Sequence, residues 1–149
     1  MEARAAVERE AAKDVIMFRG HPMVRSTHPT TIEVTTEGYL TENGDCIIGV
    51  GASKGCAGLD QRVKDRLRNE GSKVTLKVVV EDERFELRAR GDPRLELSHP
   101  HDIVIRKSDF VSDRTLALGA DASARQIPRN IVALLRDPGT TGRLEIEVE

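Results

Sequence analysis

Alternating apolar and polar residues run through most of this chain and predict β-strands. Residues 30–36 are typical, because Ile32 and Val34 alternate with polar residues, as in a strand buried on one side. An Asn43-Gly44 pair before the next apolar run is typical of a tight hairpin turn. Runs of this kind predict about nine strands, at residues 15–19, 30–36, 46–50, 73–81, 84–90, 95–97, 103–105, 115–118 and 144–148.

Two segments instead repeat apolar residues every three or four positions, the spacing of a helix with one buried side. Pro128 is tolerated only in a first helical turn, so the second helix is expected to begin near it. The two stripes are Leu59, Val63 and Leu67, and then Ile127, Ile131, Leu134 and Leu135.

Each predicted helix lies inside a block that occurs twice. Residues 45–71 align without a gap with residues 113–139, with six identities over 27 positions. Each block reads as strand, glycine-marked loop and helix, and an alternating strand follows. Either the chain carries an internal duplication with halves 14–81 and 82–149, or two ordinary β-loop-α-β units have converged.

These elements predict a mainly β (α+β) fold over residues 14–149. Many strands with two helices favour a single compact β-barrel or β-sandwich-like domain with both helices packed on it. A true duplication would add a pseudo-two-fold axis. Residues 2–13 are rich in Ala, Glu and Arg with one large apolar side chain, so we expect an N-terminal arm at residues 1–13, helical by propensity and loosely docked.

Composition restricts the classes of function. The chain has 149 residues, 38% of them hydrophobic and none Trp, so its core must be mostly Val, Ile and Leu. A net charge of −2 argues against binding nucleic acid through bulk charge. No membrane span or secretory signal is present, so we expect a cytoplasmic protein without a membrane partner. Many arginines and few amides favour a thermophilic source.

The first candidate for chemistry is the segment at residues 20–29, GHPMVRSTHP. Proline holds the residue before it in extended geometry, which fixes His21 and His28 on either side of Arg25. Two imidazoles and a guanidinium suit an anion, and neutral imidazole also binds metals. The alternative is that the His-Pro steps only shape a surface loop.

The second candidate is the segment at residues 98–110, SHPHDIVIRKSDF. A phosphate or carboxylate suits the planar guanidinium of Arg106, the compact ammonium charge of Lys107 and the hydroxyl of Ser108. Asp45 or Asp109 would orient a histidine or act as a base. The alternative is a solvated strand end with ordinary ion pairs.

The third candidate is the pair of glycine-marked loops, GVGASKG and ALGADAS. Each precedes a helix N-terminus, where free amides attract an anion, and Lys54 would add charge. The glycines lack the spacing of nucleotide-binding fingerprints, so tight strand–helix packing explains them better. No metal-binding spacing is present, and Cys46 and Cys56 are expected to be reduced thiols. The sequence does not tell whether the protein uses a cofactor.

Three segments together, GHPMVRSTHPTTIE, GDCIIGVGASKGCAGL and HPHDIVIRKSDFVSDRTLAL, resemble the archaeal domain-of-unknown-function family 371. The resemblance covers residues 15–148. It implies a small archaeal cytosolic protein with a mainly-β, sandwich- or barrel-like domain, and it implies no activity. The positions in these motifs are His21, Arg25, His28, Asp45, Lys54, His99, Asp102, Arg106, Lys107, Ser108 and Asp109.

Two functions follow from these residues. The first is binding, with or without catalysis, of a phosphorylated or carboxylated small molecule. Its catalytic candidates are His21, His28, Asp45 and Asp109, and its ligand-binding candidates are Arg25, Lys54, His99, Arg106, Lys107 and Ser108. The second is a non-enzymatic RNA- or protein-interaction module with a basic face at Arg84, Arg88 and Arg90. Convergence of the two His-Pro segments on one hollow would favour the first.

Overall fold

The computed structural model describes residues 10–149, so most of the expected N-terminal arm lies outside the described residues. The first strand, β1 (Ala12–Arg19), begins inside the segment for which an arm was expected. Its inward side chains, Ile16 and Phe18, are buried, which ties this end of the chain into the core.

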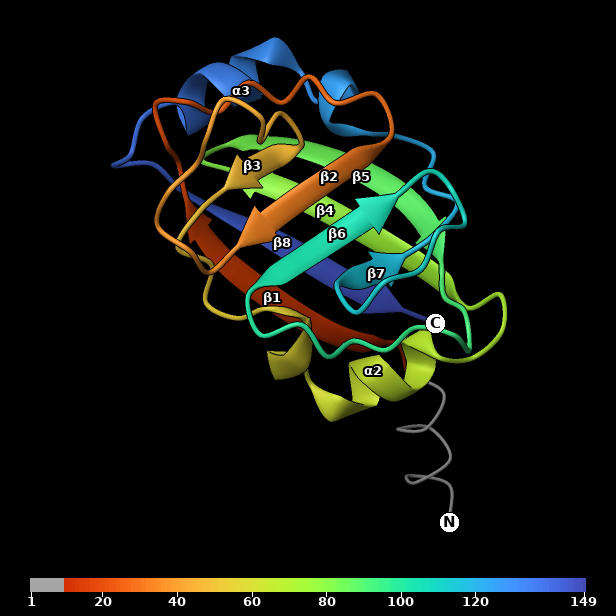
Figure 1. Ribbon diagram of the computed structural model, residues 1–149. Helices are drawn as coiled ribbons and strands as arrows, with labels where there is room; N and C mark the ends of the chain where they lie inside the picture. Colours follow the sequence, from red (N-terminus) through yellow and green to blue (C-terminus); the bar gives the residue numbers. More distant parts are fainter. Residues whose placement is uncertain (1–9) are drawn as a thin grey trace.

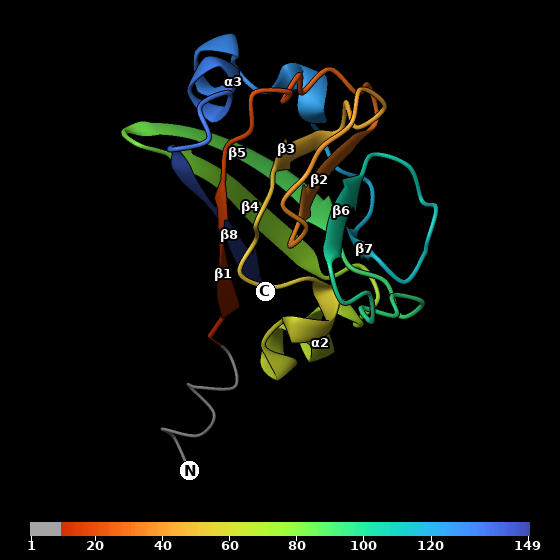
Figure 2. The same ribbon diagram turned by 60° about the vertical axis from the view of Figure 1, so that its left-hand side comes forward.

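Within this range, eight strands form two four-stranded sheets that pack face to face (Figures 1 and 2). Only isolated bridges, Arg19–Val50 and Arg90–Leu118, join the edges of the two described sheets. The sheets form no closed barrel, so of the two predicted architectures the sandwich is the one observed. The large sheet has the order β1-β8-β4-β5, with β4 (Lys73–Val80), β5 (Glu83–Arg90) and β8 (Thr141–Val148). The small sheet has the order β3-β2-β6-β7, with β2 (Thr31–Thr35), β3 (Ile47–Gly49), β6 (Asp102–Arg106) and β7 (Thr115–Ala117).

Two short helices close opposite ends of the sandwich, as Figure 2 shows. Asp60 caps α2 (Gln61–Leu67) by accepting a hydrogen bond from the backbone N–H of Arg62. Pro128 stands at the N-cap of α3 (Arg129–Leu135), just before the predicted first turn. A single 3₁₀ turn precedes each helix, η1 (Cys56–Gly58) and η2 (Ala124–Gln126). Both predicted helices are thus confirmed.

The two halves of the chain repeat the same order of elements. The series β1, β2, β3, η1, α2, β4 of the first half recurs as β5, β6, β7, η2, α3, β8 in the second. From β3 onward the elements match in the register of the repeated block. The earlier strands match in a slightly longer register, because the connection between β2 and β3 is longer than that between β6 and β7. This agreement favours internal duplication over convergence.

A pseudo-two-fold axis relates the halves, because two antiparallel pairs are centred on equivalent residues. β2 pairs with β6 about Glu33 and Val104, and β4 pairs with β8 about Lys77 and Glu145. The axis therefore crosses both sheets at these two points. Side chains from both sheets and both helices join one hydrophobic cluster, built mainly of the predicted Val, Ile and Leu.

The halves also interlock through their 3₁₀ turns. The backbone N–H of Ala57 in η1 donates to the carbonyl oxygen of His99, at 2.9 Å. The equivalent N–H of Arg125 in η2 donates to the carbonyl oxygen of His28, at 3.1 Å. Each half thus holds the His-Pro segment of the other half.

Two local predictions are wrong. Residues 95–97 form no strand, because Leu97 has a φ of 53° that interrupts extended backbone, and its apolar pattern only anchors a loop in the core. The Asn43-Gly44 pair does not join a hairpin, because β2 and β3 are parallel. It lies instead in the connection at residues 36–46.

Replacing Gly20 tests the close approach of β1 to the end of α3. A Cβ at this position would overlap the carbonyl oxygens of Leu135 and Asp137, which are backbone atoms that cannot rotate away. We expect Gly20→Ala to lower the free energy of unfolding by about 1–3 kcal/mol or more, measured by urea denaturation.

Gly139→Ala is the matched control. The nearest atom to its added Cβ is the Asp137 side chain at 3.3 Å, on an exposed turn. Its effect should stay within about 0.5 kcal/mol. Equal stability of the two variants would contradict this account of the packing.

Candidate functional site

The small sheet turns one side to the core and the other away from it. On the core side lie Ile32, Val34, Ile103 and Ile105, all buried. Because side chains alternate along a strand, the intervening residues share the opposite side, which we call the outer face. The outer face consists of Thr31, Glu33 and Thr35 from β2 and Asp102, Val104 and Arg106 from β6.

Two histidines stand at opposite ends of the outer face. His28 Nδ1 accepts hydrogen bonds from the backbone N–H groups of Thr30 and Thr31, both at 3.1 Å. His99 Nδ1 accepts from the equivalent groups of His101 and Asp102, at 3.1 and 2.8 Å. Each His-Pro step therefore caps the start of its strand. Because these caps need an unprotonated Nδ1, a neutral ring carries its proton on Nε2.

Glu33 occupies the centre of the outer face, on the pseudo-two-fold axis. Its side chain is 9% exposed, and its Oε1 lies 3.9 Å from Nη1 of Arg114. The Sγ of Cys46 lies 3.8 Å from the same oxygen. The equivalent residue in the other half is Val104, so the carboxyl group has no symmetry mate.

Burial gives this carboxyl group unusual acid–base behaviour. Burial, followed by the negative charge of Asp102, raises the pKa of Glu33 to about 7 from an ordinary value near 4.5, against the opposing charges of Arg114 and Arg106. Burial, followed by the charge of Glu33, raises the pKa of Cys46 to about 11. Glu33 is therefore partly protonated at neutral pH, while Cys46 stays a neutral thiol.

Two arginines flank Glu33 and differ in their partners. Arg114 Nη1 lies 2.9 Å from Oδ2 of Asp102, so a carboxylate balances its charge. Arg106 donates instead to the hydroxyl groups of Thr115, at 2.9 Å, and Ser112, at 3.3 Å. Within residues 10–149, no carboxylate lies within ion-pairing distance of Arg106.

A hollow of about 330 Å³ opens over the Asp102 end of the outer face. Its acid and base groups contact one another: His101 Nε2 lies 3.6 Å from Oε1 of Glu37, and His99 Nε2 lies 3.8 Å from Oδ2 of Asp102. A ligand in this hollow would meet hydrogen-bond donors, acceptors and a titrating carboxyl group. The lining residues are Glu33, Thr35, Glu37, Tyr39, Ile47, His99, His101 and Asp102.

Five of the predicted site residues gather at the outer face or directly beside it. His28 and Arg106 lie at one end, and His99 lies at the other. Lys107 and Ser108 follow β6 directly, beyond the Arg106 end. Thus one His-Pro step from each segment reaches the same face, although from opposite ends.

The other predicted site residues lie elsewhere or contribute only backbone. His21 Nδ1 accepts from the N–H of Met23, which is a turn contact near α3, and Arg25 is exposed in the same loop. Lys54 forms an ion pair with Asp14 at 2.7 Å. The backbone oxygens of Asp45 and Asp109 accept hydrogen bonds from His28 and Arg94, respectively.

Sequence reasoning missed the central residues of the face. Glu33 and Arg114 lie within the segments that carry the family resemblance but were not chosen as candidates, and Tyr39 lies outside those segments. The three residues meet only through pairing of distant strands. One signal was present, because Glu33 is a charged residue in the middle of a β-branched strand. The full burial of β2 was not foreseen, since alternation predicted a strand with one solvated side.

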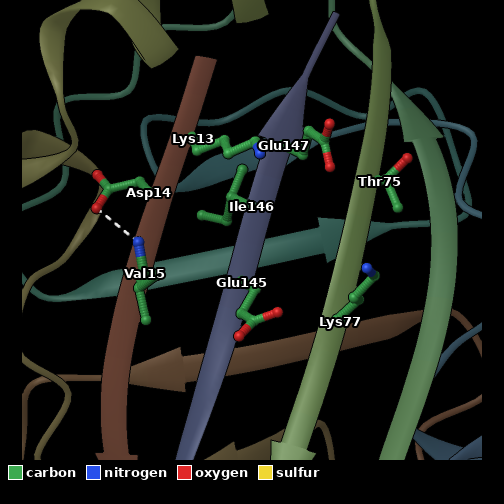
Figure 3. A pocket seen from close by; sticks show the side chains of 8 residues that line it. All are labelled: Lys13, Asp14, Val15, Thr75, Lys77, Glu145, Ile146 and Glu147. Atoms are coloured by element: carbon green, nitrogen blue, oxygen red, sulfur yellow. Dashed lines mark hydrogen bonds between the residues drawn. The ribbon is translucent and has the colours of Figure 1, made fainter. Parts of the chain in front are cut away.

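The large sheet also carries a shallow hollow, on its side away from the core (Figure 3). Lys13 from β1 and Lys77 from β4 alternate there with Glu145 and Glu147 from β8. These opposite charges largely balance, and Arg143 pairs with Glu145 at 2.6 Å. The hollow therefore has the chemistry of an ordinary solvated sheet surface.

The predicted basic face lies at the edge of this large sheet, on β5. Arg88 lies 3.7 Å from Glu86, and Arg90 lies 3.9 Å from Asp92, so carboxylates partly balance both charges. Among residues 10–149, no group of three or more His, Cys, Asp or Glu side chains is arranged to hold a metal ion. No helix in that same range is long and apolar enough to cross a membrane.

Fold and face together define a two-sheet sandwich of two interlocked, related halves, with a charged outer face on the smaller sheet. The chain belongs to the family described as a domain of unknown function, DUF371, whose sequence profile matches residues 16–149. An uncharacterised protein of Methanocaldococcus jannaschii is 41% identical over 123 residues, which cover 83% of this chain and 90% of that protein. The resemblance to an archaeal family is thus confirmed.

Replacing Glu33 by Gln tests its buried, titrating state. Because the folded protein raises this pKa, ionising Glu33 destabilises the fold as pH rises from about 4.5 to about 7. We expect Glu33→Gln to match the wild type near pH 4.5 and to exceed its free energy of unfolding by about 3 kcal/mol at pH 8.

Urea denaturation at both pH values measures this difference. Glu37→Gln is the control, because Glu37 is 43% exposed and should give nearly the same small effect at each pH. A difference between Glu33→Gln and wild type that does not change with pH would contradict the raised pKa.

Proposed function

We propose that this protein binds an anionic small molecule, phosphorylated or carboxylated, on the outer face of the small sheet. Arg106 carries the proposal, because it is a half-buried guanidinium whose hydrogen-bond partners in the described chain are hydroxyl groups. Such a group attracts an anion more strongly than an ion-paired one, since no carboxylate must be displaced. Arg114, already paired with Asp102, is the internal comparison.

The charge around Arg106 supports the same proposal. At neutral pH, Asp102 balances Arg114 and Glu33 is only partly ionised, so Arg106 leaves its end of the outer face with excess positive charge. Restricted exposure strengthens electrostatic attraction, because water screens the charges less. The hydroxyl groups of Ser112 and Thr115 hold the guanidinium in place before the ligand arrives.

Glu33 gives the bound ligand a partner for proton exchange. A carboxyl group with a pKa near 7 donates and accepts protons readily at neutral pH, which is the property of a general acid or base. Among the outer-face residues it is the one suited to catalysis. Binding by Arg106 with proton transfer by Glu33 is the catalytic form of the proposal.

Replacing Arg106 tests the anion contact directly. We expect Arg106→Gln to weaken pyrophosphate binding at least tenfold in isothermal titration calorimetry, because a charge-assisted contact is lost. Arg88→Gln is the matched control, since Arg88 is 73% exposed on the other sheet. Melting curves establish that both variants are folded. Equal affinities of Arg106→Gln and wild type would remove Arg106 from the site.

The pH dependence of anion binding tests the part played by Glu33. Sulfate is the probe, because its own charge is constant between pH 6 and pH 8. A bound anion favours protonated Glu33, so sulfate affinity should fall as pH rises through 7. Asp102 and Arg106 from β6, together with Arg114 and Cys46, face this carboxyl group.

Glu33→Gln separates the effect of Glu33 from any contribution of His28, His99 and His101. The variant should lose the part of the pH dependence that Glu33 causes, a change of several-fold in affinity across this range. The same pH dependence in variant and wild type would show that Glu33 does not respond to the anion.

A further inference from the structure

Two exposed aromatic side chains occupy equivalent positions in the two halves. Tyr39 follows the end of β2 at the same distance along the chain as Phe110 follows the end of β6. Tyr39 is 65% exposed and Phe110 is 60% exposed, whereas Phe18 is 2% exposed and Phe85 is partly buried. Single exposed apolar residues are ordinary, but this pair is related by the pseudo-two-fold axis.

Both aromatic residues stand at the rim of the outer face. Each lies shortly beyond the end of its strand, and β2 and β6 are antiparallel, so the two rims lie at opposite ends. Tyr39 lines the hollow beside His99 and His101. Phe110 lies against Arg106, whose Cζ is 4.9 Å from the ring centroid.

The spacing and charge between these rims restrict what fits. Asp102 and Arg106 mark the two ends of the face, and the length of strand between them places their Cα atoms about 13 Å apart. The guanidinium of Arg106 and the partly protonated Glu33 lie along this length. A matching ligand carries a flat ring at each end and negative charge in between.

We propose that the outer face binds a dinucleotide unit, with its two bases on Tyr39 and Phe110 and its linking phosphate held by Arg106. Proteins hold unpaired bases by stacking them on exposed aromatic rings. The polar side-chain atoms of His99, Asp102 and Glu33 offer hydrogen bonds to such a base. This inference rests on the proposed function. A free dinucleotide and two consecutive nucleotides of a single strand share this chemistry.

The test compares ligands that have two bases, one base or none. The probes are two adenosines joined by one phosphodiester (adenylyl-adenosine, the dinucleotide), adenosine monophosphate, pyrophosphate and an eight-nucleotide oligoadenylate strand. Each is titrated calorimetrically. We expect the dinucleotide to bind more tightly than adenosine monophosphate and pyrophosphate. Tyr39→Ala and Phe110→Ala should each weaken dinucleotide binding about five- to hundredfold. Tyr39→Ala, which does not touch Arg106, should leave pyrophosphate binding unchanged.

Val15→Ala is the control variant, because Val15 is 44% exposed on the other sheet and should change no affinity. A second readout needs no variant. Tyr39 is the single tyrosine of the chain, so its ring protons give one identifiable NMR signal, which a stacked base should shift upfield. Preference for the eight-nucleotide strand would identify single-stranded nucleic acid as the source, and equal affinity would identify the free dinucleotide.

Failure of this inference differs from failure of the proposed function. Equal affinities for dinucleotide, mononucleotide and pyrophosphate, with no shift of the Tyr39 signal, would overturn the dinucleotide site. Anion binding would then still depend on Arg106. Absence of binding for every probe, pyrophosphate included, would overturn both.

Discussion

The antiparallel pairing of β2 with β6 is the constraint on which the rest of the structure depends. Because it is centred on Glu33 and Val104, it places equivalent segments of the two halves at opposite ends of one small sheet. The His-Pro caps, the long connections and the exchanged 3₁₀ turns all take their positions from this pairing. A slip of one residue would turn Glu33 into the hydrophobic core.

This constraint explains how a short sheet buries charge on the side away from the core. Loops from both halves converge on the outer face and bring Cys46 and Arg114 within 4 Å of Glu33. Val104 occupies the equivalent position, so the fold accepts an apolar residue there. A carboxyl group retained where an apolar side chain fits departs from what folding requires, and such departures are typical of functional sites.

The sequence predicts local structure well and the site only in part. Alternation located the strands of both described sheets and spacing located both helices, since these patterns depend on one face of one element. Alternation failed at Leu95 and Leu97, whose apolar spacing resembles a strand although the positive φ of Leu97 interrupts the extended backbone. Arg106 and His99 were found through their motifs, but Glu33, Arg114 and Tyr39 become neighbours only when strands distant in sequence pair.

The internal symmetry separates residues that serve the fold from residues that serve a site. Features alike in both halves are mostly structural: His28 and His99 cap strands, and Gly51 and Gly119 share a φ of 58°. Features that differ include the carboxyl group with the raised pKa, because Glu33 matches Val104 and Arg114 matches Cys46. Tyr39 and Phe110 fit neither group, because they are alike and yet largely exposed. An aromatic pair kept at equivalent positions without being buried gains little for folding, so its symmetry is best explained by a ligand with two similar ends.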